Sequence, residues 1–167
     1  TIPSEVELET LMIGEDGKAS IMPFGHRSIG QTYQVLNIAD FCNECGNCST
    51  FCPTSGAPYL DKPKLSLSES SFNAESEAFL FHFEGESSGI RYKREGFFYT
   101  LVDLSDRYLC SVEGVEIGLS KNDFKIVEYR IPGENTTWKG EWIEHFYRMV
   151  VLLDHIPEYL KPGVRLS

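Results

Sequence analysis

A short cysteine-rich segment holds the residues of this sequence that are best suited to chemistry. Four of the five cysteines in the 167-residue chain lie within the segment CNECGNCSTFC. The spacing is C-x2-C-x2-C-x3-C, formed by Cys42, Cys45, Cys48 and Cys52, and Pro53 follows directly. Thiolates are soft ligands that suit zinc, cuprous copper and iron–sulfur clusters. The segment is therefore expected to bind a metal ion or a metal cluster.

The spacing distinguishes between these metals. Structural zinc usually takes one C-x2-C pair from a loop and a second ligand pair from a distant knuckle, and the sequence has no distant pair. Thiolates at every third residue can wrap around a cubane cluster, and Gly46 allows the backbone to turn tightly. The run C-x2-C-x2-C-x3-C-P is the bacterial ferredoxin signature. It predicts a [4Fe–4S] cluster; a zinc-binding structural or protein-interaction module is the alternative.

The five cysteines of the sequence do not determine which residue is the fourth ligand of the predicted cluster. In two-cluster ferredoxins, the fourth cysteine of such a run binds the other cluster. Cys52 would then serve a second cluster ligated outside this chain, and the first cluster would lack one sulfur. The missing ligand is Cys110, or Cys52 turned back, or a cysteine of a matching motif on another segment or subunit. We favour the matching motif, and a start at Thr1 fits a fragment. Because Cys110 alternates with Tyr108 and Val112, it is predicted to be a core residue.

Three zones follow one another along the chain. Residues 1–32 are predicted to form an N-terminal hairpin or extension, because two apolar runs flank the turn-like GEDGK. Residues 33–76 are the ferredoxin-like iron–sulfur segment, with a strand predicted from Thr32 to Ile38. Its second part, TSGAPYLDKPKLSLSES, is rich in Pro, Gly and Ser and is predicted to be an ordered loop or linker. Residues 77–167 are predicted to be a β-rich domain with a C-terminal helix.

The third zone combines two patterns. Five runs of aromatic and β-branched residues between residues 78 and 131 predict the strands of an antiparallel meander: AFLFHF, GIRYK, FFYTLVD, YLCSV and FKIVEYR. The segments between them, the longest of which is VEGVEIGLSKND, are predicted to be turns. Farther on, apolar residues recur every three or four positions, which predicts a helix that covers the sheet. Its stripe is Trp138, Trp142, Phe146, Met149, Val150 and Leu153. Asn135 to Thr137 are expected to cap this helix and Pro157 to end it. The predicted fold class is α+β: a ferredoxin-type cysteine loop, an antiparallel β-meander and a C-terminal amphipathic helix.

Charge and composition exclude several classes of protein. The chain has 15 basic and 25 acidic residues, a formal net charge of −10, which disfavours binding to nucleic acid or anionic membranes. No run approaches the roughly 18 apolar residues of a membrane span, and TIPSEVELE does not resemble a secretory signal. Five cysteines, four of them in one loop, do not form a typical disulfide framework. The predicted location is a reducing cytoplasm.

The cysteine segment also resembles a known family. NIADFCNECGNCSTFCPTSGAPYLDKPKL is similar to the second cysteine motif of large bacterial iron–sulfur flavoproteins designated putative selenate reductase iron–sulfur subunits, which are related to the small subunit of glutamate synthase. CNECGNC, FCP and GAPYLDK carry the resemblance, within residues 33–65, about a fifth of the chain. The resemblance implies a two-cluster ferredoxin-like module, fed by an upstream flavin and nicotinamide region. It implies that the four clustered cysteines are cluster ligands. Residues 1–32 lack the family's first cysteine motif, which favours a carboxy-terminal piece of a larger protein.

Other residue types offer weaker candidates. His26, His82, His145 and His155 are scattered and are expected to be solvated or hydrogen-bonded. Lys62 and Lys64 follow the cysteines; a solvated turn is favoured over a role in balancing the charge of the cluster, which Glu44 would oppose. The sequence has no P-loop, Gly-x-Ser-x-Gly or Gly-x-Gly-x-x-Gly run, so no independent catalytic centre is expected.

The predicted function is that of an iron–sulfur electron-transfer domain. It would relay electrons through a [4Fe–4S] cluster as part of a larger flavin- and NAD(P)H-linked oxidoreductase, without being catalytic by itself. The expected partners are a flavoprotein or NAD(P)H-binding region, in the same or another chain, and a redox partner.

Overall fold

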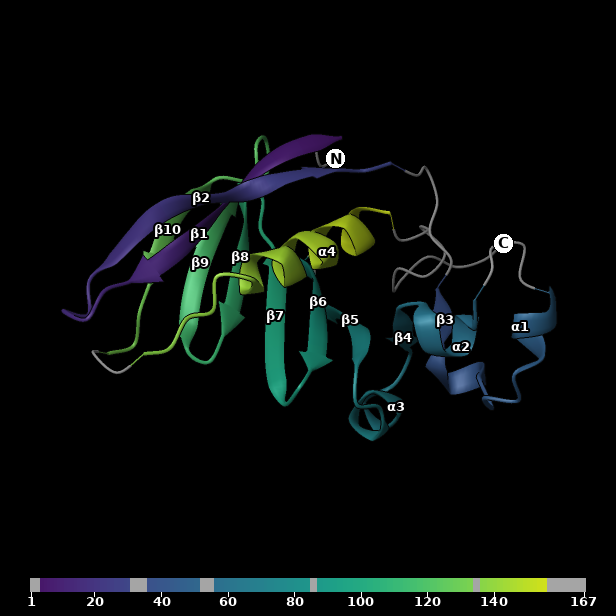
Figure 1. Cartoon of the computed structure of the whole chain (residues 1–167). Coiled ribbons are helices and arrows are strands. Elements are labelled where there is room, and N and C mark those ends of the chain that lie inside the picture. Colours follow the sequence, from purple (N-terminus) through teal and green to yellow (C-terminus); the bar gives the residue numbers. More distant parts are fainter. Residues whose placement is uncertain (1–3, 31–35, 52–55, 85–86, 134–135, 156–167) are drawn as a thin grey trace.

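A computed structural model describes residues 4–30, 36–51, 56–84, 87–133 and 136–155. Within these residues ten strands form two sheets. One sheet has two strands, β1 and β2, and the other has eight, in the order β10-β9-β8-β7-β6-β5-β4-β3 (Figure 1). The helix α4 (Trp142–Asp154) lies across one face of the larger sheet. None of the described helices is long and apolar enough to cross a membrane.

The first sheet is an antiparallel hairpin of β1 (Glu5–Ile13) and β2 (Ala19–Ser28). Alternating residues of β1, among them Val6 and Leu8, are buried in the main core, which is why this hairpin packs on the body. Two hydrogen bonds to the Thr10 hydroxyl group tie the hairpin to the segment before α4. The Oγ1 atom donates to the carbonyl of Gly140 (3.0 Å) and accepts from the indole nitrogen of Trp138 (3.0 Å).

Six strands of the large sheet are antiparallel neighbours that follow chain order. They are β5 (Ala78–Glu84), β6 (Ser87–Arg94), β7 (Phe97–Asp103), β8 (Arg107–Val112), β9 (Val115–Ser120) and β10 (Ile126–Arg130). Two of the turns between them are Glu95-Gly96 and Glu113-Gly114, and all four residues have positive φ. This is the geometry of type I′ hairpin turns, whose twist matches that of the strands they join.

The core lies between this sheet and α4. Side chains of the strands, such as Tyr92, Tyr99 and Ile117, belong to one buried cluster with Phe146 and Met149 of the helix. The ring of Tyr99 meets that of Phe146 edge-on at 5.9 Å. Residues spaced three or four apart place the apolar side of α4 on the sheet.

The helix is shorter than its sequence pattern predicts. Trp138 and the segment up to Gly140 precede α4, and Glu141 is the N-cap. The capping role predicted for Asn135 to Thr137 is therefore wrong, since the described Thr136 instead donates its hydroxyl hydrogen bond to the carbonyl of Gly133 (2.7 Å). Pro157 lies outside the described residues.

The remaining part of the large sheet is parallel. β3 (Asn37–Ile38) pairs with β4 (Lys64–Ser66), which pairs with β5, both in parallel register. Short helices make the crossovers: η1 (Ala39–Phe41), α1 (Asn47–Phe51) and α2 (Pro58–Asp61) lie between β3 and β4, and α3 (Glu69–Ala74) lies between β4 and β5. The prediction of a loop or linker for TSGAPYLDKPKLSLSES is therefore wrong, because two helices and a strand lie there. Of the predicted strand Thr32 to Ile38, the structure describes the last three residues, of which β3 takes two.

The predicted fold class is also wrong. The described chain is mostly β, with α4 as its one helix of more than six residues, rather than an α+β fold led by a ferredoxin-type loop. β3 and β4, the strands on either side of the cysteines, belong to the same eight-stranded sheet as β5 to β10. Strands of two and three residues, joined by crossovers, are too short to leave an alternating pattern in the sequence.

Candidate metal centre

The cysteine loop, residues 42–51, leaves the sheet at its β3 edge. It follows β3 and η1 directly and precedes α2 and β4. Figure 1 shows α1 and α2 beyond β3 and β4, at the end of the sheet opposite β10. Loops that follow parallel strands commonly carry binding residues, because the adjacent strand ends hold them firmly.

The structure places the predicted ligands at different depths. Cys42 is partly buried, whereas Cys45 and Cys48 are exposed, and all three are free thiols. Cys52 lies outside the described residues. In the described part of the chain, no three Cys, His, Asp or Glu side chains are grouped so that they could hold a metal ion. Three free thiols within seven residues are nonetheless the donor chemistry that an iron–sulfur cluster requires.

The backbone turns sharply around Cys45. Glu44 and Gly46, on either side of it, have φ of 53° and 76°. A Cβ atom added to Gly46 would meet no atom within 4 Å, so the conformation, rather than a lack of space, favours glycine there. The amide of Cys45 donates to the Oδ1 atom of Asn43 (3.3 Å), and the amide of Ser49 donates to the carbonyl of Gly46 (3.0 Å). The thiol of Cys45 is exposed to solvent in this turn.

Two side chains hold the start of the loop. The amide nitrogen Nδ2 of Asn37 lies 3.6 Å from the Sγ atom of Cys42 and 3.4 Å from the carbonyl oxygen of Tyr59. Asp40 accepts hydrogen bonds from the backbone amide of Leu67 (2.7 Å) and the hydroxyl of Ser68 (2.9 Å). These bonds, first of all the one from Leu67, hold the pKa of Asp40 below its usual value. η1 is thereby tied to the turn after β4.

Lys64 links the middle of the loop to the sheet. Its Nζ atom lies 2.9 Å from the Oε1 atom of Glu44 and 2.8 Å from the Oε2 atom of Glu75. The hydrogen bond to Glu75, followed by that to Glu44, raises the pKa of Lys64, so the side chain stays charged. With 19% of its side chain exposed, Lys64 is not the solvated turn residue that the sequence favours. The pairing joins residues 20 positions apart, and no local pattern signals it.

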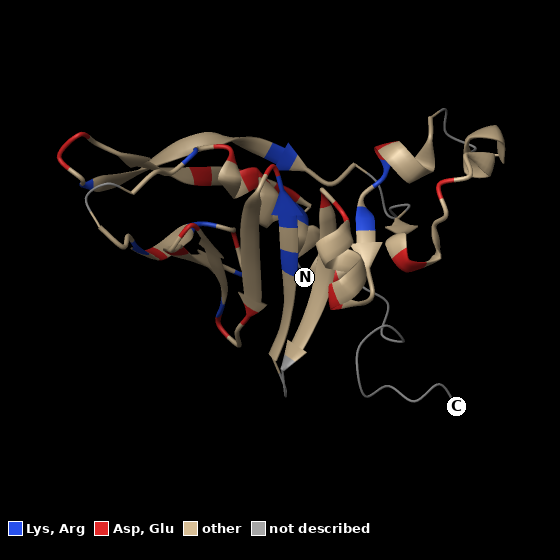
Figure 2. Cartoon of the chain, turned by 90° about the horizontal axis from the view of Figure 1, so that it is seen from below, with Lys and Arg blue, Asp and Glu red and all other residues tan. Residues whose placement is uncertain are grey.

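Exposed apolar side chains lie within the loop and next to it. Phe41, directly before Cys42, is 82% exposed; Phe51, directly before Cys52, is 83% exposed; and Leu60 of α2 is 65% exposed. α1 carries no charged residue, and its ribbon is uniformly tan in Figure 2. The sequence shows that Phe41 and Phe51 directly precede cysteines, and this position is a signal that could have identified them as part of the site. Their hydrophobicity alone predicts that they are buried.

Cys110 lies elsewhere. It is completely buried on β8, opposite Leu101 on β7 and Ile117 on β9, and its burial raises the pKa of the thiol. Five strand spacings separate β8 from β3, which is about 24 Å along the sheet. The prediction that Cys110 is a core residue is confirmed, and its distance from the loop argues against its being the missing ligand.

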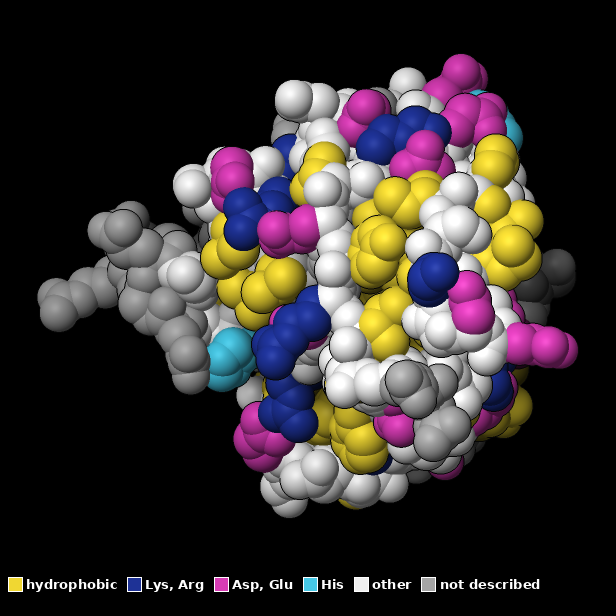
Figure 3. Space-filling model, turned by 90° about the vertical axis from the view of Figure 1, so that its left-hand side faces the viewer, with side chains coloured by type: hydrophobic (Ala, Val, Ile, Leu, Met, Phe, Trp, Pro, Cys, Tyr) yellow, Lys and Arg dark blue, Asp and Glu magenta, His cyan; other side chains and the backbone are white. Residues whose placement is uncertain are grey.

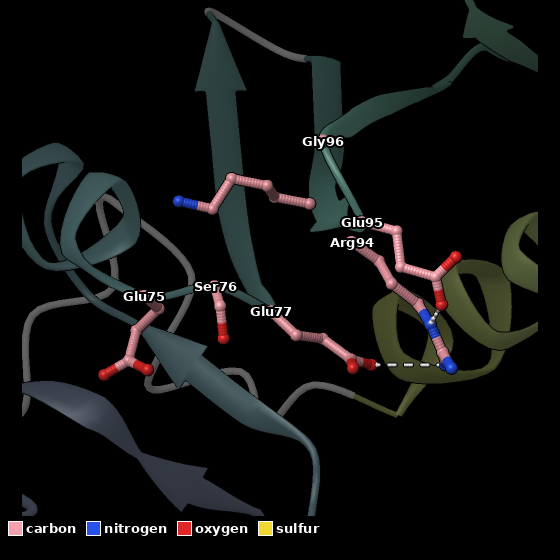
Figure 4. A pocket seen from close by; sticks show the side chains of 7 residues that line it. Glu75, Ser76, Glu77, Arg94, Glu95 and Gly96 are labelled. Carbon is pink, nitrogen blue, oxygen red and sulfur yellow. Dashed lines mark hydrogen bonds and ion pairs between the residues drawn. The ribbon is translucent and has the colours of Figure 1, made fainter.

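Within the described residues, neither His145 nor the hollow beside β6 belongs to a second metal centre. His145 packs against the rings of Tyr92 and Tyr99, and burial lowers its pKa to about 4, so it is neutral near pH 7. A hollow of about 450 Å³ lies beside β6 and is shown in Figure 4. It is lined by Glu75, Ser76, Glu77, Lys93, Arg94, Glu95 and Gly96. Arg94 pairs there with Glu77 and Glu95, and Lys93 donates to carbonyls of α3, so its cations are already partnered.

The far end of the molecule also exposes apolar side chains. They are Met12, Ile21, Met22, Val127 and Tyr129, from the hairpin and β10. Figure 3 looks onto this end and shows the hydrophobic areas interrupted by charged side chains. Among the described residues of this surface, no three Cys, His, Asp or Glu side chains are grouped so that they could hold a metal ion.

Comparison with known proteins gives one kind of match. A segment of 49 residues, 29% of this chain, is 45% identical to part of the protein named "Putative oxidoreductase YgfK" of Escherichia coli K12. The protein of the same name from Escherichia coli O157:H7 matches equally well. The chain spans about 5% of the length of these relatives. No family model matches the chain, and no solved structure matches it.

Proposed function

We propose that this chain is an iron–sulfur electron-transfer domain of a larger oxidoreductase. Cys42, Cys45 and Cys48 would hold a [4Fe–4S] centre, and Cys52 would bind a second cluster that is otherwise ligated outside this chain. The observation that carries the proposal is the uninterrupted C-x2-C-x2-C-x3-C-P run. The similarity of 49 residues to part of a protein named an oxidoreductase supports the same role.

The geometry of the loop agrees with such a role. Its thiols are free, and Cys45 and Cys48 face solvent at an edge of the protein. When bound, a cluster of this kind accepts and returns single electrons. The residues of the chain would hold the thiolates, supply the donor of Asn37 to the Cys42 sulfur, and set the charge around them. A reducing cytoplasm would keep the thiols available.

A partner is needed to complete and cover the site. Cys110 is buried strands away, so we propose that a cysteine outside this chain supplies any further ligand. Phe41 and Phe51 are more than four-fifths exposed beside the thiols, and they offer apolar surface that the partner would cover. The proposed partner is the remainder of a flavin- and NAD(P)H-linked oxidoreductase, in the same or another polypeptide, which would deliver the electrons.

The test is to purify the chain without oxygen, or to reconstitute it with ferrous iron and sulfide. We expect about four iron and four sulfide per chain, broad visible absorption, and a paramagnetic signal after reduction with dithionite. Stoichiometric zinc without iron would identify the zinc-binding structural or interaction module instead. Repeating the reconstitution with a peptide that carries a second ferredoxin-type cysteine run tests the external ligand, since added peptide should increase iron retention.

A further inference from the structure

Two residues that are paired across β3 and β4 both reach into the cysteine loop. Asn37 lies opposite Lys64 in the parallel register of these strands. Asn37 directs its amide toward the sulfur of Cys42, and Lys64 directs its ammonium group toward the carboxylate of Glu44. The edge of the sheet therefore presents a hydrogen-bond donor and a positive charge, side by side, to the first turn of the loop.

Glu44 is the residue of the loop that most needs support. Its positive φ of 53° is uncommon for a residue with a side chain and is strained unless its surroundings impose it. Lys64 supplies that restraint, and Glu75, which follows α3, holds Lys64 from the other side. Glu44 is thereby linked to the body of the protein through a partly buried lysine.

The charges in this arrangement also matter for the thiols. Glu44 is separated from Cys42 by one residue and directly precedes Cys45, so its carboxylate adds negative charge beside two thiolates. The ammonium group of Lys64 lies 2.9 Å from that carboxylate and offsets it. Charge and hydrogen bonds beside thiolate ligands set the reduction potential of the group they hold.

We propose that Asn37 and Lys64 are positioning residues of the cysteine loop. They fix its backbone against the sheet, and Lys64 cancels the charge of Glu44 next to the thiolates. The part that concerns charge rests on the proposed electron-transfer function, whereas the part that concerns position holds for the metal-free chain as well.

The positioning part is tested on the metal-free full-length chain by amide hydrogen exchange. Lys64→Met and Asn37→Leu should each make the peptide of residues 39–51 exchange several-fold faster, while peptides from β7 and β8 keep their rates. Lys64→Arg retains the positive charge and should exchange like the wild type. Unchanged exchange of the loop peptide in Lys64→Met would overturn the proposal, and so would an increase that extends to β7 and β8, since that would reflect general destabilisation.

The charge part is tested by measuring the midpoint potential of chains reconstituted with ferrous iron and sulfide. Lys64→Met should shift the potential to more negative values, Glu44→Gln to more positive values, and the double variant should lie close to the wild type. Asn37→Leu should also give a more negative potential, and the shift should persist in the Glu44→Gln background. If Lys64 and Glu44 had only structural roles, Lys64→Met and Glu44→Gln would not shift the midpoint potential in opposite directions.

The two possible failures can be told apart. If iron is incorporated but Lys64→Met and Glu44→Gln have the potential of the wild type, the inference is wrong and the proposed function stands. If no iron is incorporated under any condition, the proposed function and the charge part fall together. The hydrogen-exchange result then still decides whether Asn37 and Lys64 position the loop.

Discussion

Two regions of the eight-stranded sheet are stabilised in different ways: strands β6 to β9 under α4, called the packed end below, and the edge at β3, called the cysteine end. Around β6 to β9, strand residues and α4 form one continuous buried core, with Tyr99, Leu101 and Phe146 almost free of solvent contact. Around β3, the short elements η1, α1 and α2 contain no buried residue. Directed polar contacts through Asn37, Asp40 and Lys64 hold that end instead.

The comparison shows that the residues that stabilise the fold and the residues proposed to bind the cluster lie in different parts of this protein. The packed end needs no ligand, because apolar burial supplies the driving force for folding. The cysteine end has little apolar burial of its own, so its shape depends on a few hydrogen bonds, on ion pairs and, under the proposed function, on the bound group and a partner. Changes at the two ends should therefore affect different measurements.

The largest expected effect is on stability at the packed end. Phe146→Ala should lower the free energy of unfolding by about 3–5 kcal/mol, because it leaves a cavity in the core between α4 and the sheet. Phe51→Ala, the same change at an exposed site of the cysteine loop, should alter it by no more than about 0.5 kcal/mol. Urea denaturation followed by circular dichroism measures both. Equal destabilisation by the two variants would contradict the proposed difference in stability between the packed end and the cysteine end.

The next effect concerns the metal. Cys48→Ser should abolish most of the iron content after reconstitution and leave the urea midpoint of the metal-free chain nearly unchanged, because its side chain is exposed. Cys110→Ser should retain the iron but lose about 1–3 kcal/mol of stability, since a hydroxyl group would be buried in an apolar site. Iron loss in Cys110→Ser together with retention in Cys48→Ser would reverse the assignment of the two ends.

The reaction rates of the thiols give a further test of the difference between the packed end and the cysteine end. In the native metal-free chain, Cys45 and Cys48 should react with a disulfide reagent such as DTNB at rates typical of exposed thiols. Cys110 should react more than about 1,000-fold more slowly, because it is reached only through opening of the core and because burial raises its pKa. Mass spectrometry of the labelled peptides assigns each rate. Rapid labelling of Cys110 would show that the core around β8 opens easily.

The packed end could be predicted from sequence better than the cysteine end. Five aromatic and β-branched runs between residues 78 and 131 coincide with strands β5 to β8 and β10, because six residues or so are enough for a pattern to appear. The prediction of a turn for VEGVEIGLSKND is wrong, because strand β9 lies within it. The fold class was still wrong, since β3 and β4 are too short for such a pattern. Trp138 continues the helical spacing of apolar residues but packs before α4, where Thr10 of the distant hairpin accepts its hydrogen bond.

In the candidate site as well, some features could be predicted from the sequence and others could not. Thiol spacing is local, and it identified three described cysteines and one outside the described residues as candidate ligands. The support of the loop is not local: Lys64 reaches back 20 positions to Glu44, and Asp40 reaches forward 27 positions to Leu67. Single-sequence reasoning has no signal for such contacts, because they depend on which strands become neighbours.

The smallest expected effect is the pH dependence of the Asp40 contacts. The pKa of Asp40 is lowered in the folded chain, so its carboxylate stabilises the fold above the unfolded pKa of about 3.9, and this contribution disappears as the pH falls through the lower folded value. Because the group lies near the surface, the contribution should be below about 1 kcal/mol. Asp40→Asn loses one of the two acceptor oxygens and should be less stable than the wild type at pH 6, with the difference shrinking toward pH 3. Thermal unfolding midpoints of both chains across this range measure it. A difference that grows on acidification would mean that the carboxylate is not what ties η1 to the turn after β4, and that the cysteine end is held by other contacts.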